Sequence, residues 1–124
     1  MSPRENDANI ADATVLWRAV HNLQVYRDDD GVERAQSWAF ESRDNEMSAW
    51  VAAETELGKL QAKFPESRIA EFTVGDAREL RNIVTRDPVG DDDSHVVVCP
   101  VPGKSKAQVK KDARRLASKA RLLP

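Results

Sequence analysis

The chain has 124 residues and a net charge of −2, with 40% hydrophobic and 32% charged residues. This length suits one domain with a core of its own. No segment approaches the roughly 20 apolar residues that span a bilayer, and the first residues lack the apolar run of a signal peptide. We therefore expect a single domain in the cytoplasm, with no membrane partner.

The first third of the chain predicts strands after a polar start. Residues 1–12 are polar and show no periodicity, so we expect a mobile segment ahead of one domain that spans 13–124. Gly31 follows three aspartates in a turn, where glycine readily supplies a positive φ. Apolar and β-branched residues around this turn predict strands at 14–20, 23–26 and 36–42.

The middle of the chain predicts a helix over 52–64. Apolar residues recur there at spacings of four, three and four, which is the period of a helix face. These residues are Ala53, Leu57, Leu60 and Phe64. Pro65 disfavours helical conformation in the residue before it and ends the helix. Residues 43–51, ahead of the helix, predict a loop or a strand.

Beyond residue 67, extended segments are interrupted by a short helix. The carboxylate of Asp76 can accept a hydrogen bond from the first turn of that helix. Alternating or β-branched residues predict extended chain at 68–74, 82–88 and 94–100. Together these elements favour an α+β fold, with a small mixed sheet and two main helices on one face, over a doubly wound parallel sheet.

The end of the chain predicts a basic amphipathic helix over 105–123. Ser105 is a favoured N-cap residue, and apolar residues follow at spacings of four, three, four and three. This stripe comprises Val109, Ala113, Leu116, Ala120 and Leu123. Residues 104–124 contain eight Lys and Arg against one Asp, so this segment carries the strongest local charge of the chain.

Six cations of this segment are candidates for contact with a nucleic acid or another anionic partner. They are Lys104, Lys106, Lys110, Lys111, Arg114 and Arg115. Three interpretations stay open: the cations only face water while the stripe docks on the core, they bind phosphates, or the helix lies on a membrane. The negative net charge of the chain disfavours a dedicated nucleic-acid domain, and an alanine-rich stripe without an aromatic disfavours a membrane.

Four polar residues within apolar segments are candidates for an anion-binding cleft. Arg18 lies inside a strand, and a guanidinium is rarely buried without a partner. His21, Ser37 and His95 are, like arginine, residue types that recognise phosphate or carboxylate. An anion-receptive hollow forms if folding brings the four side chains together.

The sequence predicts no metal site and no cofactor. The aspartate runs lack the ligand spacing of a calcium loop and are expected to be solvated turns. The Gly103 to Ser105 segment lacks the earlier glycine of a phosphate-binding loop, because position 98 is Val. Cys99 is the sole cysteine, which excludes an internal disulfide and favours a small buried side chain.

The order of several short motifs resembles a small family of uncharacterised bacterial proteins. The motifs are "WRAVH", "SWAF", "MS" and "DPVGDDDSHVVV", within about residues 16–100. The matching residues are Arg18, His21, Ser37, Phe40, Ser48, Asp87, Pro88 and His95. Gln36 stands where a second serine is frequent in the family. The resemblance implies a bacterial protein and no particular activity.

These features favour a non-enzymatic binding or regulatory module with an anion-receptive cleft, which meets an anionic ligand or a protein partner. One alternative is a small transferase or hydrolase, because Arg18 and Ser37 with a later Glu54 or Glu71 resemble the arginine, serine and glutamate of ADP-ribosyltransferases. That resemblance implies that the arginine holds a dinucleotide, the serine orders its strand and the glutamate stabilises the reacting ribose. Nucleic-acid binding through the basic helix is a second alternative.

Overall fold

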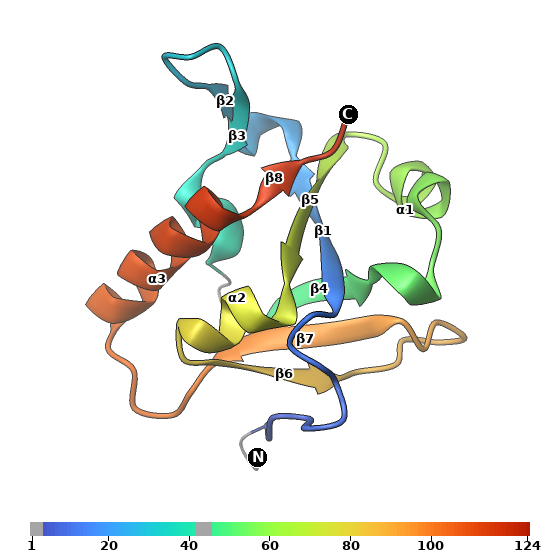
Figure 1. Ribbon diagram of the computed structural model, residues 1–124. Helices are drawn as coiled ribbons and strands as arrows, with labels where there is room; N and C mark the ends of the chain where they lie inside the picture. The colour runs from blue at the N-terminus through green and yellow to red at the C-terminus, as the bar shows by residue number, and fades with distance from the viewer. Residues whose placement is uncertain (1–3, 42–45) are drawn as a thin grey trace.

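The computed structural model describes residues 4–41 and 46–124 (Figure 1). Within these residues, six strands form one sheet in the order β6-β7-β4-β1-β5-β8, and β2 pairs with β3 in a separate hairpin. Each neighbouring pair is antiparallel. The strands are β1 (Val15–His21), β2 (Val25–Arg27), β3 (Glu33–Ala35), β4 (Met47–Val51), β5 (Ser67–Thr73), β6 (Asn82–Arg86), β7 (His95–Pro100) and β8 (Arg121–Leu122).

Three α-helices and three short 3₁₀ helices accompany the strands in the described part of the chain. The α-helices are α1 (Leu57–Lys63), α2 (Val74–Glu79) and α3 (Lys106–Lys119), and the 3₁₀ helices are η1 (Asn22–Gln24), η2 (Ser37–Phe40) and η3 (Ala52–Glu54). The predicted α+β class is therefore confirmed, and the C-terminal helix is the longest. None of the described helices combines the length and the apolar character that crossing a membrane requires.

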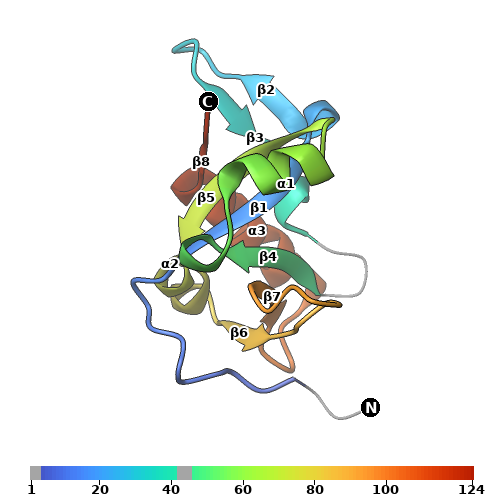
Figure 2. The ribbon, with the colours of Figure 1, turned by 90° about the vertical axis from the view of Figure 1, so that its right-hand side faces the viewer.

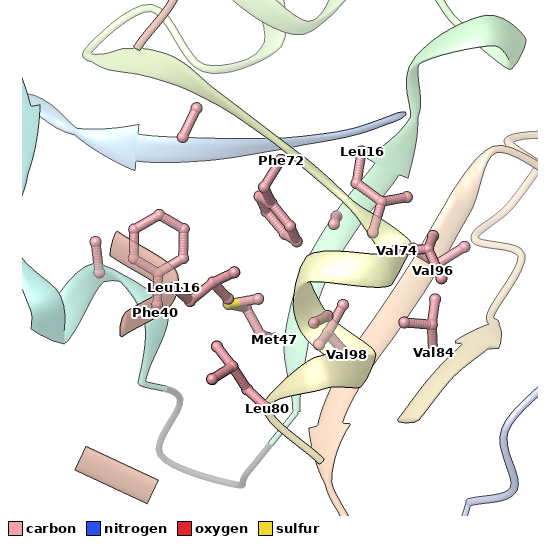
Figure 3. Close-up of a cluster of buried hydrophobic side chains, with 14 of the residues drawn as sticks. Leu16, Phe40, Met47, Phe72, Val74, Leu80, Val84, Val96, Val98 and Leu116 are labelled. Atoms are coloured by element: carbon pink, nitrogen blue, oxygen red, sulfur yellow. The ribbon is translucent and has the colours of Figure 1, made fainter. Parts of the chain in front are cut away.

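The larger core fills the space between the sheet and the helices α2, α3 and η2. Leu16 and Val20 point into it from β1, and Phe40 meets Phe72 there edge to face at 6.0 Å between ring centroids. Leu116 extends into the same core from α3 (Figure 3). Ala113 and Leu116 of the predicted apolar stripe therefore dock on the sheet, whereas Leu123 lies beyond α3 and packs against the smaller core.

A smaller core lies on the other face of the sheet, under α1. Trp50, Leu60 and Ile69 are buried in it, and Figure 2 shows α1 in front of the strands with α3 behind them. The helices thus cover both faces, whereas the sequence favoured one face. The reason is that β1 carries apolar residues on both sides, so each side needs a cover.

Three elements of the structure differ from the sequence prediction in their boundaries or in their type. Residues 37–40 form the helix η2 where a strand was expected over 36–42, of which residue 42 lies outside the described residues. The single helix expected over 52–64 divides into η3 and α1, because Thr55 and Glu56 adopt extended conformations. Helix α3 ends at Lys119, since the following residues pair with the edge of β5 as β8.

Residues 4–12, which the sequence predicted to be mobile, contact the main domain. Ile10 is buried in the larger core, and the amide of Asp7 donates to the carbonyl of Val84 at 2.9 Å. The guanidinium of Arg78 donates to the carbonyls of Ile10 and Asp7 at 2.7 and 2.8 Å. This segment therefore lies along α2 and β6.

Candidate functional site

Arg18 bonds to main-chain carbonyls within the fold. Its Nε donates to the carbonyl of Ala39 at 2.8 Å, and its Nη1 donates to the carbonyl of Ser48 at 2.7 Å. Burial lowers the pKa of Arg18 to about 10, which leaves it charged at neutral pH. No carboxylate of the described residues pairs with it. Arg18 thus ties η2 to β4 where β1 and β4 separate.

His21 lies at the exposed end of β1 and caps the helix η1. Its Nδ1 accepts a hydrogen bond from the amide of Leu23 at 3.0 Å, and its backbone amide donates to the side chain of Gln24. Its Nε2 lies 3.6 Å from a carboxylate oxygen of Glu66. These local contacts fix the imidazole at the surface.

His95 lies at the start of β7 and is buried. Its Nδ1 is 2.7 Å from the carbonyl of Asp87, and its ring meets that of Trp50 edge to face at 5.2 Å between centroids. The amide of Asp87 donates in turn to the carbonyl of His95. The imidazole therefore links the start of β7 to the residue that follows β6.

The structure does not bring the four candidate residues to one hollow. Trp17, Trp50 and His95 are successive partners across β1, β4 and β7, so His95 lies on the face covered by α1. Arg18 alternates with Trp17 and points to the opposite face. Ser37 begins η2, which packs on α3 on that opposite face. Arg18 and Ser37 thus share a face of the sheet, while His95 does not.

Five of the six candidate cations lie exposed on α3 and form what we call the α3 cationic face. They are Lys106, Lys110, Lys111, Arg114 and Arg115. In the part of the chain that the structure describes, none of these five makes an ion pair with a carboxylate. They lie on the side of α3 away from its buried residues, which are Asp112, Ala113, Leu116 and Ala117.

Lys104, the sixth candidate, is not available to a partner. Its side chain is only 3% exposed, and its Nζ lies 2.8 Å from Oδ2 of Asp112. The same ammonium donates to the carbonyl of Leu80 at 2.7 Å. Burial opposes ionisation of Asp112, but hydrogen bonds from Lys104 and Gln108 outweigh it and hold the pKa of the carboxyl below its ordinary value. Lys104 therefore neutralises a buried carboxylate at the base of α3.

A hollow of about 550 Å³ adjoins the α3 cationic face at the C-terminal half of the helix. Arg114 and Ser118 line it from α3, and Ser37 lines it from η2. Tyr26 and Arg34 line it from the β2–β3 hairpin, where they are directly paired across the two strands. The hollow therefore combines two guanidinium groups, two hydroxyls of serine and one aromatic ring.

The two arginines of this hollow differ in their surroundings. Nε of Arg34 lies 2.5 Å from Oδ2 of Asp28, and this hydrogen bond is the main cause that lowers the pKa of Asp28. Arg114 pairs with no carboxylate among the described residues. The uncompensated charge of the hollow is therefore that of Arg114.

The glutamates of the transferase alternative line a different cavity. Glu54 and Glu71 both border a hollow of about 760 Å³ that includes neither Arg18 nor Ser37. Glu54 binds Arg86 through both oxygens at 2.5 and 2.8 Å, which lowers its pKa. The pKa of Glu71 is lowered chiefly by the hydrogen bond from the indole of Trp17. Both carboxylates are therefore ionised and already bonded, and the expected trio does not assemble.

The described residues contain no group of three or more metal-binding side chains. Cys99 is buried, and burial raises the pKa of its thiol. A thiol with a raised pKa is a poor nucleophile near neutral pH. This agrees with the expectation of a small buried residue.

The sequence did not point to the hairpin side of the hollow. Tyr26 and Arg34 are eight residues apart, and only the pairing of β2 with β3 brings them together. The signal was present in the alternation of residues 23–26 ahead of a glycine turn, which is typical of a hairpin. Gly31 adopts a φ of 79° in that turn, as expected.

The chain matched no protein-family model, no curated protein and no solved structure in three comparisons.

Proposed function

We propose that the protein is a non-enzymatic binding module that holds an anionic partner on the α3 cationic face and in the adjoining hollow. The observation that carries this proposal is the set of five exposed cations without carboxylate partners among the described residues. Ser37, one of the four residues that the sequence singled out, lines the hollow.

The spacing of these cations supports a role in binding. Lys106 and Lys110, Lys110 and Arg114, and Lys111 and Arg115 are each four residues apart on α3. Like charges at this spacing destabilise a helix by about 0.2–0.5 kcal/mol per pair. A bound polyanion removes this repulsion, so its binding and the stability of the helix are coupled.

The setting of the face also favours an anionic partner. The apolar side of α3 is buried, so the helix presents its cations on a fixed support rather than on a mobile tail. Cations clustered on one surface raise the local concentration of anions and speed their association. The cytoplasmic location and the bacterial source expected from the sequence stay predictions.

The proposal is tested with inorganic polyphosphate as the probe. Each exposed ion pair contributes about 0.2–1 kcal/mol. The variant Lys110→Ala/Lys111→Ala is therefore expected to bind polyphosphate roughly 2- to 30-fold more weakly than the unmodified protein at low salt. Affinity is measured by isothermal titration, with thermal stabilisation by the probe as a second readout.

Lys59→Ala/Lys63→Ala is the matched control, because it removes two exposed lysines from α1 on the opposite face of the sheet. We expect its affinity to stay within twofold of that of the unmodified protein. Equal loss in both double variants, or no binding of polyphosphate by the unmodified protein, would contradict the proposal.

A further inference from the structure

Two aromatic side chains are exposed on the elements that adjoin α3, one on the β2–β3 hairpin and one on η2. Tyr26 is 41% exposed and Trp38 is 51% exposed, although large aromatic residues contribute most when they are buried. Tyr26 borders the hollow together with Arg114 of α3. Trp38 follows Ser37, which borders the same hollow. The Tyr26 ring therefore borders the hollow, and Trp38 is exposed on η2, the element that packs against α3.

The fold holds these rings without covering them. In η2, Ala39 and Phe40 are buried in the larger core and anchor the helix, while Trp38 is left at the surface. In the hairpin, Val25 packs against the core, and the next residue, Tyr26, points to the other side of the strand. Each exposed ring is thus adjacent to a buried residue that fixes its backbone.

We propose that the anionic partner is a single-stranded nucleic acid, whose phosphates lie along the α3 cationic face and whose bases stack on Tyr26 and Trp38. This inference rests on the proposed function and names its partner. Proteins that bind single strands combine a cationic track for the backbone with aromatic rings for the bases. Both features are present here: the cations lie on α3, Trp38 lies on η2, which packs against α3, and Tyr26 lies on the hairpin that borders the same hollow.

The chemistry of the two rings separates this partner from other anions. A polyphosphate or an acidic peptide would use the cations and leave both rings exposed. A duplex keeps its bases stacked on one another, so their faces are not open to aromatic side chains. An unpaired strand uses cations and rings together. Helix α3 is about 21 Å long at 1.5 Å per residue, which provides room for several phosphates.

The test uses a fluorescently labelled oligo(dT) of about 12 nucleotides, a length within the range of known single-strand sites. Tyr26→Ala and Trp38→Ala are each expected to weaken its binding at least about fivefold, because the loss of one stacked base has that effect or more. Tyr26→Phe and Trp38→Phe keep an aromatic ring and are expected to retain most of the affinity. Trp38 does not line the hollow, so Trp38→Ala and Trp38→Phe are not expected to change the affinity for polyphosphate.

Intrinsic fluorescence supplies a second readout. Trp17 is hydrogen-bonded to Glu71 and Trp50 is buried, so Trp38 is the tryptophan most open to a bound base. We expect oligo(dT) to quench the tryptophan emission of the unmodified protein, and the quenching to disappear in Trp38→Phe. Polyphosphate is expected to produce no such quenching.

The outcomes separate this inference from the proposed function. Binding of polyphosphate with no effect of the aromatic substitutions on oligo(dT) binding would overturn the inference and leave the proposed function in place. Equal affinity for duplex DNA, or tighter binding of polyglutamate than of oligo(dT), would overturn it in the same way. Failure to bind both polyphosphate and oligo(dT) would overturn both.

Discussion

Four arginines on the sheet or on segments packed against it, which we call the sheet region, have different surroundings from the residues of the α3 cationic face. Arg4, Arg68, Arg78 and Arg86 each lie within 3.0 Å of a carboxylate oxygen. The five residues of the α3 cationic face have no such partner among the described residues. In the sheet region, positive charge therefore holds elements of the fold together, while on the α3 cationic face it is left open to a partner from outside.

Lys104 shows that position along the chain does not decide between these two roles. It belongs to the same basic segment as the α3 cationic face, yet it is buried against Asp112. From charge and position in the sequence alone, Lys104 and Lys106 would both be predicted to be exposed and available to a partner. The difference arises because Asp112 is the one carboxylate of that segment and faces the core side of α3.

The largest effect on stability is expected from breaking the buried pair. Asp112→Ala leaves the ammonium of Lys104 buried without its counter-charge, which destabilises a protein by about 3–5 kcal/mol. Urea denaturation measures the change in the free energy of unfolding. Lys104→Met/Asp112→Leu removes both charges and is expected to recover most of the loss. A loss below about 1 kcal/mol in Asp112→Ala would show that the pair is not buried as described.

The buried pair of Lys104 and Asp112 is also expected to make the stability of the protein depend on pH, with a smaller effect. The pKa of Asp112 in the folded protein lies below its ordinary value of 3.8. Its contribution to stability is therefore fully present above pH 3.8 and is lost as the pH falls through the lower folded-state pKa. Asp112→Asn cannot titrate, so the stability difference between it and the unmodified protein should shrink on acidification in that window. A constant difference down to pH 2 would contradict the assignment.

A surface pair of the sheet region is expected to matter less. Arg86 and Glu54 form a bidentate contact but remain partly exposed. Arg86→Ala should lower the free energy of unfolding by about 0.2–1 kcal/mol, the range for exposed ion pairs. Oligo(dT) binding should not weaken, because Arg86 lies on β6 and outside the α3 cationic face. A weakening comparable to that of Lys110→Ala would remove the distinction between the two regions.

The smallest change in stability is expected on α3 itself. Lys110→Ala removes a like-charge neighbour of Lys106 and Arg114, so the free energy of unfolding should stay within about 0.5 kcal/mol or rise slightly. Thermal unfolding of Lys110→Ala measures this change in stability. The same measurement shows that the variant is folded, which the binding measurements require. A loss of more than 1 kcal/mol would indicate that Lys110 supports the fold.

Strong local patterns allowed much of the fold to be predicted. The strands expected at 14–20, 68–74 and 94–100 correspond to β1, β5 and β7, because β-branched runs have few alternatives to a buried strand. The helix near the C-terminus begins after Ser105, whose hydroxyl accepts from the amide of Gln108 as an N-cap. Local sequence patterns were therefore sufficient to predict the elements whose residues follow one clear pattern.

Other parts depended on contacts between distant segments. The residues of η2 are apolar enough to read as a strand, but Arg18 binds the carbonyl of Ala39 and holds that segment as a helical turn. The candidate site likewise depends on contacts between distant segments, which the sequence alone does not reveal. The pairing of Tyr26 with Arg34, and the packing of η2 on α3, assemble the hollow from three segments that are separate in the sequence.

The most direct measurement is the salt dependence of oligo(dT) binding. A single strand gives a slope of about −0.7 in log affinity against log salt for each phosphate contacted, so five contacts predict a slope of about −3.5. Lys110→Ala/Lys111→Ala/Arg114→Ala should reduce its magnitude by about 2, while Lys59→Ala/Lys63→Ala should leave it unchanged. A slope that is the same in all three proteins would contradict the assignment of phosphate contacts to the α3 cationic face.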